Sequence, residues 1–272
     1  MIIPFTKMHG LGNDFVMINT NHMKGVTNTM EFAKIVANRR LGIGCDQLVC
    51  FTELAPSHYL MFIHNADGSV AEACGNATRC LALLMKDKAG ANNPICIEVQ
   101  NRKLTCTLEK SEIVRVNMGS ASFEEDWMPQ QNSLWELSNT YKLNPRELIC
   151  VDIGNPHLII FHDALSELEM DFLGKKFATH ELFPKGVNVN FVNLVDSDIH
   201  LTVWERGVGL SLACGSGACA SFAASCKLGF VQDKKASIFL KLGNLQMKLE
   251  GNDIIMRGTA TKIATGEYIF QD

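Results

Sequence analysis

The chain has 272 residues with a formal net charge of −4, and 47% of them are hydrophobic. That length can bury one large core or two smaller ones, and the charge balance leaves no electrostatic footprint for nucleic acid. No apolar run approaches the ~18 residues of a membrane-spanning helix, so we expect no membrane partner. Because the first residues do not resemble a signal peptide, the ten cysteines are expected to be reduced thiols of a cytoplasmic protein.

The first half is expected to consist of short strands and two helices. Asn28, followed three residues later by Glu31, is typical of a capping box and predicts a helix that ends near Arg40. A run of small and apolar residues, 77–86, predicts a second helix that stops before Gly90. The expected strands lie within 5–18, which contains a glycine turn, and at 45–51, 59–63, 95–99, 103–108 and 113–118.

The second half follows a polar stretch, 119–132, which we expect to connect two domains. Helices are expected at 171–182 and 217–227. A final strand at 266–270 is expected to join the first domain. The other expected strands are 135–141, 148–153, 158–162, 187–192, 199–204, 237–242, 245–250 and 254–257.

Two cysteines stand in matching positions. Cys74 and Cys214 each directly precede a glycine and a helical run of small residues, so both are expected at helix N-termini, where free N–H groups and the helix dipole favour an anion. A thiol there has its pKa lowered from ~8.5 to between ~3.5 and 7.5. The pair therefore predicts two reactive thiols. The remaining cysteines are most simply core thiols: Cys45, Cys50, Cys80, Cys96, Cys106, Cys150, Cys219 and Cys226.

The surroundings of the two cysteines also match. Asn65 and Glu205 each stand nine residues before the cysteine of their own half, and segment 12–18 resembles segment 154–160. A repeat of this length indicates two similar domains and not a solenoid, whose units are far shorter. The sequence therefore predicts an α+β protein of two related domains.

The predicted domain limits follow from the connecting stretch and the final strand. The first domain comprises residues 1–118 and 263–272 and carries Cys74. The second comprises residues 119–262 and carries Cys214.

Seven short motifs in chain order resemble the diaminopimelate epimerase family, and the resemblance covers essentially the whole chain. The motifs are Gly10-x-Gly12-Asn13-Asp14-Phe15, Asn65-Ala66-Asp67-Gly68-Ser69, Cys74-Gly75-Asn76, Gly154-Asn155-Pro156-His157, Asn188-Val189, Glu205-Arg206-Gly207-x-Gly209 and Ala213-Cys214-Gly215-Ser216-Gly217-Ala218. The resemblance implies two pseudo-symmetric domains, each a barrel-like mixed or antiparallel sheet around a central helix. It also implies an active site in the cleft between them.

The activity implied by the resemblance is the interconversion of LL-2,6-diaminopimelate and meso-diaminopimelate, for lysine and peptidoglycan precursor synthesis. The substrate is a small molecule, and the resemblance implies no cofactor and no metal. It leaves open whether the chain forms a homodimer.

The site residues are carried over one by one. Cys74 and Cys214 are the expected acid/base residues, His157 would partner Cys74, and Glu205 would lie near Cys214. The residues expected to contact substrate are Asn13, Gln47, Asn65, Gly75, Asn76, Asn155, Asn188, Glu205, Arg206, Gly215 and Ser216.

Two thiols suit this chemistry for a physical reason. Inverting an α-carbon without a cofactor requires one group to remove the proton from one face and another to deliver a proton to the opposite face. Negative charge then develops on the substrate carboxylate, and helix N-termini supply preorganised N–H donors for it. Loss of one such donor in other enzymes costs ~2.7–4 kcal/mol.

Some positions depart from the usual family pattern, and two alternatives stay open. Leu210-Ser211 replace Glu-Thr, Gly258-Thr259 replace Gly-Pro, and Cys45 replaces Ala. One alternative is a racemase of the same fold for proline, hydroxyproline or histidine. The other is a non-catalytic amino-acid-binding or redox-switch protein, which would not exchange the α-proton of an amino acid in D₂O.

Overall fold

The computed structural model describes residues 1–71, 74–89, 94–100, 102–109, 112–143, 146–196 and 198–270. Ala73, next to the first predicted cysteine, and Gly90, the predicted helix stop, lie outside the described residues. The chain forms two compact units. Unit 1 is Met1–Asn117 with Arg257–Asp272, and unit 2 is Met118–Met256.

Unit 1 contains a mixed sheet in the order β16-β1-β2-β3-β4-β5-β6-β7. Antiparallel and parallel pairs alternate from β1 to β6, because α1 connects β2 to β3 and α2 with α3 connects β4 to β5. The strands are β1 (Ile2–Gly10), β2 (Asn13–Asn19), β3 (Gln47–Ala55), β4 (His58–Asn65), β5 (Ile95–Val99), β6 (Arg102–Leu108), β7 (Ile113–Ser120) and β16 (Thr261–Ile269). The helices are η1 (Thr20–His22), α1 (Thr29–Ala37), α2 (Gly75–Leu84) and α3 (Lys86–Ala89).

Unit 2 repeats this topology with the order β14-β13-β11-β10-β9-β8, and β12 adds to β11. The same alternation recurs, because α5 connects β9 to β10 and α6 lies between β11 and β13 along the chain. The strands are β8 (Glu147–Asp152), β9 (Pro156–Phe161), β10 (Asn188–Val195), β11 (Asp198–Glu205), β12 (Gly209–Ser211), β13 (Lys235–Leu240), β14 (Gly243–Glu250) and β15 (Asp253–Thr259). The helices are α4 (Gln131–Thr140), α5 (Glu167–Ala178) and α6 (Gly215–Lys227).

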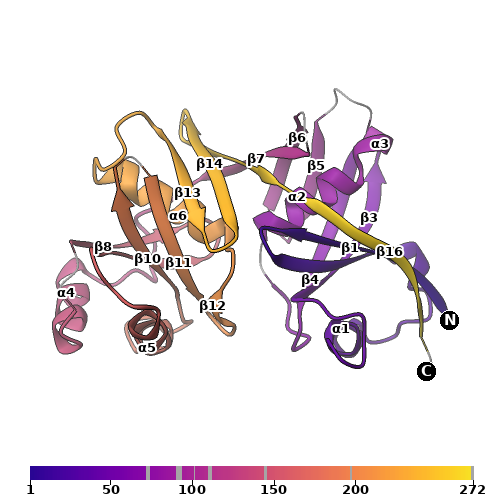
Figure 1. Ribbon diagram of the computed structural model, residues 1–272, viewed down its shortest axis with the longest axis horizontal. Helices are drawn as coiled ribbons and strands as arrows, with labels where there is room; N and C mark the ends of the chain where they lie inside the picture. The colour runs from indigo at the N-terminus through magenta and orange to yellow at the C-terminus, as the bar shows by residue number, and fades with distance from the viewer. Residues whose placement is uncertain are drawn as a thin grey trace. The chain divides into compact units, whose positions relative to one another are not determined.

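A central helix lies inside the sheet of each unit (Figure 1). Helix α2 packs against β1, β2, β5, β6 and β16, and α6 packs against β8 to β11, β13 and β14. Both helices are rich in Gly, Ala, Ser and Cys, so strands can approach them from several sides, and every residue from Gly215 to Ser225 is buried. The predicted α+β fold with pseudo-symmetric domains is confirmed. The sheets curve around the helices but do not form closed barrels, since the strand order is an open path through the described residues.

One predicted strand is a helix. Residues 135–141 were expected to be extended, but α4 covers most of that range. Its buried side chains, Leu134, Leu137 and Ser138, recur with the spacing of one helical face. Glu136, which lies between them, is exposed, so the helical period outweighs the local Trp-Glu-Leu alternation.

The predicted helix limits also shift at two places. Helix α5 begins at Glu167, earlier than the predicted residue 171, because Ser166 and Glu169 form a capping box. Helix α1 ends at Ala37, where Asn38 adopts an extended backbone and its side chain accepts from Arg40 N and Leu41 N.

The chain returns to unit 1 at Arg257, earlier than the predicted residue 263. The Arg257 guanidinium forms an ion pair with Glu109 of unit 1. Two residues later, Thr259 O accepts a hydrogen bond from Arg79 Nε at 3.2 Å. These contacts attach the second half of β15 to unit 1, where β16 then pairs with β1 as predicted.

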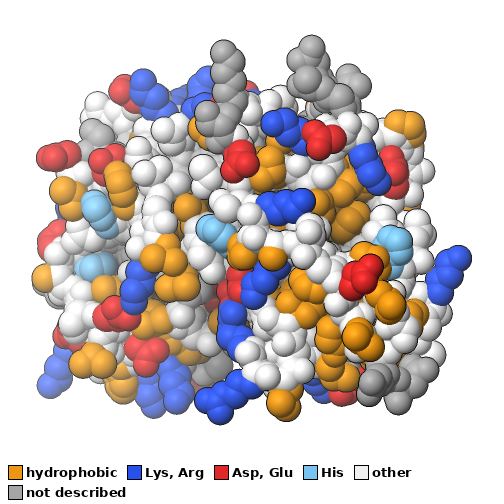
Figure 2. All heavy atoms as spheres, turned by 45° about the vertical axis from the view of Figure 1, so that its right-hand side comes forward, with side chains coloured by type: hydrophobic (Ala, Val, Ile, Leu, Met, Phe, Trp, Pro, Cys, Tyr) orange, Lys and Arg blue, Asp and Glu red, His pale blue; other side chains and the backbone are white. Residues whose placement is uncertain are grey.

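The surface of the molecule carries both signs of charge. Figure 2 shows acidic and basic side chains interspersed over one face, with small hydrophobic areas between them. Among the described residues, no helix has the length and apolar character needed to cross a membrane.

Candidate active site

Cys74 and Cys214 are the N-cap residues of α2 and α6, as predicted. Each has an extended backbone, and each Sγ accepts a hydrogen bond from the amide three residues later, Ala77 N or Gly217 N, at 3.4 Å. The following helices supply further N–H groups at the same end. Each thiol therefore lies where backbone dipoles favour negative charge.

In unit 1, Asn13 connects the start of β2 to the start of α2. Its Oδ1 accepts from Cys74 Sγ at 3.6 Å and from Asn76 Nδ2 at 3.2 Å. The other end of the same amide, Nδ2, donates to Asp46 Oδ2 at 3.0 Å. Asn13 thus brings together the cysteine and a second predicted substrate contact.

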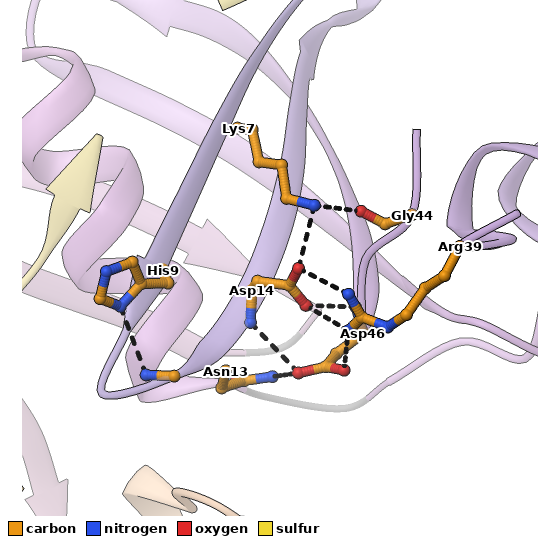
Figure 3. A network of polar contacts seen from close by, with 8 residues as sticks. Lys7, His9, Asn13, Asp14, Arg39, Gly44 and Asp46 are labelled. Atoms are coloured by element: carbon orange, nitrogen blue, oxygen red, sulfur yellow. Dashed lines mark hydrogen bonds and ion pairs between the residues drawn. The ribbon is translucent and has the colours of Figure 1, made fainter. Parts of the chain in front are cut away.

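A cluster of charged side chains contacts Asn13 through Asp46 (Figure 3). Asp46 Oδ2 also accepts from Asp14 N at 3.1 Å, and Arg39 contacts both Asp14 and Asp46 at 2.7 Å. Lys7 Nζ lies 3.1 Å from Asp14 Oδ2. Burial alone would raise the pKa of Asp14, but the hydrogen bonds from Arg39 and Lys7 outweigh it and hold the pKa below its usual range. The cluster stays charged and fixes the loop that carries Asn13.

Gln47 and Asn65 form a second pair in unit 1. They face each other in the register of β3 and β4, and Gln47 Nε2 donates to Asn65 Oδ1 at 2.8 Å. Asn65 Nδ2 donates to Ser69 Oγ at 3.0 Å. Gln47 Oε1 is buried and has no hydrogen-bond partner among the described residues, so it is an acceptor for which a bound ligand could supply a donor.

In unit 2, Ser216 connects Cys214 to the start of β9. Cys214 Sγ lies 3.5 Å from Ser216 Oγ, which accepts from Asn155 Nδ2 at 3.3 Å. His157 Nε2 lies 3.2 Å from the same hydroxyl oxygen and 3.1 Å from Asn155 Oδ1. Four of the predicted residues are therefore neighbours in this unit.

His157 is fully buried, with 0% of its surface exposed. Burial lowers its pKa to about 4, against a smaller opposing effect of its hydrogen bond to Asn190. Asn190 Nδ2 donates to Gly217 O at 2.9 Å, so its Oδ1, 3.2 Å from His157 Nδ1, must accept. The imidazole is therefore neutral at pH 7.

Asn188 contacts Arg206, another residue expected to contact substrate. Its Nδ2 donates to Pro156 O at 3.1 Å, and its Oδ1 accepts from Arg206 N at 2.9 Å. The Arg206 guanidinium donates to the backbone oxygen of Lys185. Glu205 ends β11, where it pairs with Gly209 of β12.

The two units place equivalent residues alike. Asn13 contacts the side chain two residues after Cys74, and Asn155 contacts the side chain two residues after Cys214. In each unit the cysteine belongs to one group of contacting side chains, and other predicted residues form a second group, Gln47 with Asn65 in unit 1 and Asn188 with Arg206 in unit 2. His157 belongs to unit 2 and Cys74 to unit 1, so their pairing stays a prediction.

The other described thiols differ from the pair. Burial raises the pKa of Cys45, Cys50, Cys80 and Cys150 to about 12. Burial also raises the pKa of Cys96, Cys106 and Cys226. Cys106 is buried as expected, but Cys96 and Cys226 are only partly buried, so they are not the core thiols that the sequence predicted.

Sequence reasoning missed two buried polar residues of these groups. Asn190 lies on the same strand as Asn188, and the alternation of asparagines along 187–192 was a signal for it. Arg79 is fully buried and donates to Asn76 Oδ1 at 2.7 Å. Its position within a helix of small and apolar residues was the only signal in the sequence.

Comparison with known proteins shows the family of the chain. The sequence profile named diaminopimelate epimerase matches residues 5–124 and 149–263. The chain belongs to the diaminopimelate epimerase family. Family members include the diaminopimelate epimerase of Rickettsia felis, which is 49% identical over 98% of this chain and 97% of its own. That of Rickettsia prowazekii is 48% identical over 99% and 98%.

Solved structures share the fold of this diaminopimelate epimerase family member at low sequence identity. A predicted epimerase from Pseudomonas aeruginosa has a TM-score of 0.73 and 13% identity, covering 99% of this chain and 100% of that one. A hydroxyproline epimerase from Agrobacterium vitis, with trans-4-hydroxy-L-proline bound, has a TM-score of 0.71 and 12% identity, covering 98% and 91%. These likenesses show the fold alone.

Proposed function

We propose that this protein interconverts LL-2,6-diaminopimelate and meso-diaminopimelate without a cofactor. The observation that carries the proposal is the equivalent placement of Cys74 and Cys214, each capping a buried helix in a unit of the same topology. Membership of the family supports the choice of substrate.

The reaction moves one proton off the α-carbon and one proton onto it. One cysteine, as thiolate, takes the α-proton, and the electron pair of that C–H bond delocalises into the carboxylate. The other cysteine, as thiol, gives its proton to the opposite face of the carbon, and its own S–H electron pair stays on sulfur. The two cysteines exchange protonation states in each turnover.

The helix N-termini stabilise the charge that develops between these steps. The N–H groups of Gly75, Asn76, Gly215 and Ser216 are donors at the first turns of α2 and α6. They are fixed by the helices before substrate binds, so no reorganisation is needed as the carboxylate gains charge.

Selectivity must come from the far end of the substrate, because two thiols can invert almost any α-carbon. We assign this role to Asn65, Asn155, Asn188, Glu205 and Arg206. The set carries both charges and several amides, which suits a distal group with both carboxylate and ammonium. A polar group that loses water on ligand binding and gains no partner costs ~1–3 kcal/mol, so an apolar amino acid would bind poorly.

The same-fold alternative is less well supported. The hydroxyproline epimerase and proline racemase structures are only 12% and 15% identical to this chain, whereas the diaminopimelate epimerases are 48–49% identical over nearly the full length. A cytoplasmic location and a homodimer stay predictions.

The test is exchange of the α-proton of LL-diaminopimelate in D₂O, followed by NMR together with formation of the meso form. Wild type should exchange and epimerise, and Cys74→Ala and Cys214→Ala should each lose at least about 10³-fold in kcat. Cys226→Ala is the control, since burial raises the pKa of that thiol to about 11 and it should keep normal turnover. Near-normal turnover in either active-site variant would overturn the two-base scheme. Faster α-proton exchange with proline or lysine than with LL-diaminopimelate would overturn the choice of substrate.

A further inference from the structure

Arg79 is a buried cation close to the N-terminus of α2. Its side chain is 0% exposed, although it follows Cys74 by only five residues. Nη2 donates to Asn76 Oδ1 at 2.7 Å, Nη1 to Gly75 O at 3.3 Å and Nε to Thr259 O at 3.2 Å. A buried cation at this end opposes the helix dipole and costs desolvation energy.

These contacts determine which end of each amide faces which neighbour. Arginine can only donate, so the atom of Asn76 that it contacts must be the amide oxygen. The nitrogen of that amide is then the group 3.2 Å from Asn13 Oδ1. At the far end, the carboxylate of Asp46 can only accept, so it fixes the nitrogen of Asn13. Arg79 at one end and Asp46 at the other thus hold the amides of Asn76 and Asn13 in one orientation.

The packing leaves no room for Arg79 to shift toward β1. A Cβ placed on Gly10 would lie 3.0 Å from Arg79 Nη2 and 3.1 Å from Asn76 Cβ. Glycine at this position lets β1 approach the pair more closely than a side chain would allow. The guanidinium is thus packed closely between β1 and α2.

We propose that Arg79 is a positioning residue for the anion-binding N-terminus of α2. It holds the first helical turn and the Asn76 amide in place, and it adds a desolvated positive charge behind the N–H groups that receive the substrate carboxylate. This inference rests on the proposed function, because the carboxylate is that of the proposed substrate.

Unit 2 lacks this charge at the equivalent position. Cys219 follows Cys214 by the five residues that separate Arg79 from Cys74. A neutral side chain, Asn190, donates to another backbone oxygen of the first turn of α6, Gly217 O, at 2.9 Å. The two helix N-termini should therefore differ in their attraction for anions, with α2 the stronger. Cys214 consequently serves as an internal control.

The test compares alkylation of the ligand-free protein by iodoacetate and by iodoacetamide, with each modified cysteine quantified by peptide mass spectrometry. Both reagents react with the same thiolate, so the ratio of their rates cancels the thiolate fraction and reports attraction for the carboxylate alone. In wild type the ratio should be higher at Cys74 than at Cys214. Arg79→Met should lower it about tenfold at Cys74 and leave it unchanged at Cys214.

Two further variants test whether misfolding, or a purely structural role of Arg79, explains a lower ratio in Arg79→Met. Arg79→Gln keeps hydrogen-bonding groups without the charge, and it should lower the ratio at Cys74 as Arg79→Met does. Arg79→Lys keeps the charge and should restore most of the ratio, but it should raise KM for LL-diaminopimelate because Asn76 loses the planar fork that holds it.

An unchanged ratio at Cys74 in a folded Arg79→Gln variant would overturn the proposal, as would an equal fall at both cysteines. The readout does not depend on turnover. Wild-type protein that fails to epimerise but shows the expected ratios would refute the proposed function and leave the role of Arg79 at an anion site intact.

Discussion

At the scale of single residues, we expect the chemistry at Cys74 and Cys214 because of their position on the backbone. Cys80 lies in the same helix as Cys74, yet burial raises its pKa to about 12, so it stays protonated at neutral pH. Cys74 differs because it precedes the helix and accepts from a backbone amide. Position at the cap, not residue type, separates a reactive thiol from an inert one.

His157 gives a prediction about stability and pH. The unfolded chain binds a proton at this residue near pH 6.5, whereas the folded protein does so only near about pH 4. Above pH 6.5 both states are neutral and His157 has no effect. As the pH falls from 6.5 to 4, the unfolded state gains the proton first, and the folded state loses up to about 3 kcal/mol of relative stability.

The measurement is urea unfolding of wild type and His157→Gln at pH 7, 6 and 5. The substitution should lower stability at pH 7, because Ser216 and Asn190 lose a partner, and it should flatten the decline toward pH 5. His22→Gln, which replaces an exposed histidine, should leave the wild-type slope. If the free energy of unfolding still falls as steeply toward pH 5 in His157→Gln, the acid sensitivity comes from other groups.

At the scale of elements, close approach of backbones determines which small residues are needed. Helix α5 contains Gly174, which ordinarily weakens a helix by ~1 kcal/mol relative to alanine. Here a Cβ would lie 2.4 Å from Trp204 Cγ of β11. The glycine lets α5 lie directly on this tryptophan, whose Nε1 also donates to Asp171 Oδ1 at 3.2 Å.

We therefore expect Gly174→Ala to destabilise the protein by about 1–3 kcal/mol, opposite in sign to its helix propensity. Chemical unfolding measures this change. In a Trp204→Gly background, which removes Cβ and Cγ of that side chain, the clash is relieved, and the same substitution should become neutral or stabilising. Equal effects in both backgrounds would mean that the tryptophan does not determine the need for glycine.

At the scale of the whole molecule, unit 1 is built from both ends of the chain. Strand β16 pairs with β1 from Ile2↔Ile269 to His9↔Thr261. Two aromatic rings at its end pack edge-on against Phe32 of α1, with centroid distances of 6.1 Å for Tyr268 and 5.3 Å for Phe270. The last residues of the chain thus complete the core of the first unit.

This arrangement predicts a local effect of changes at the C-terminus. The double substitution Tyr268→Ala and Phe270→Ala should speed hydrogen exchange in β1 and α1 by tenfold or more, about the effect of 1.4 kcal/mol. Exchange in α6 of unit 2 should stay at the wild-type rate, as measured by mass spectrometry. Ile263→Ala, at an exposed position of the same strand, is the matched control. A uniform increase over both units would show that they unfold as one.

Much of this site could be predicted because its signals are local. A cysteine before a glycine and a small-residue run predicts a helix cap, and capping is decided by neighbours within one turn. The recurrence of the pattern in both halves predicted paired domains, and the strand order of the two units confirms it.

The sequence by itself therefore determined the cap positions of Cys74 and Cys214, most strands and the pairing of two halves, since short-range hydrogen bonding and periodicity encode them. Only the tertiary structure decided that Arg79 is buried. In isolation, Arg79 resembles any solvated helix residue. Its burial depends on Gly10 and Thr259, which are distant in sequence, and a contact between distant segments leaves no periodic signal in either.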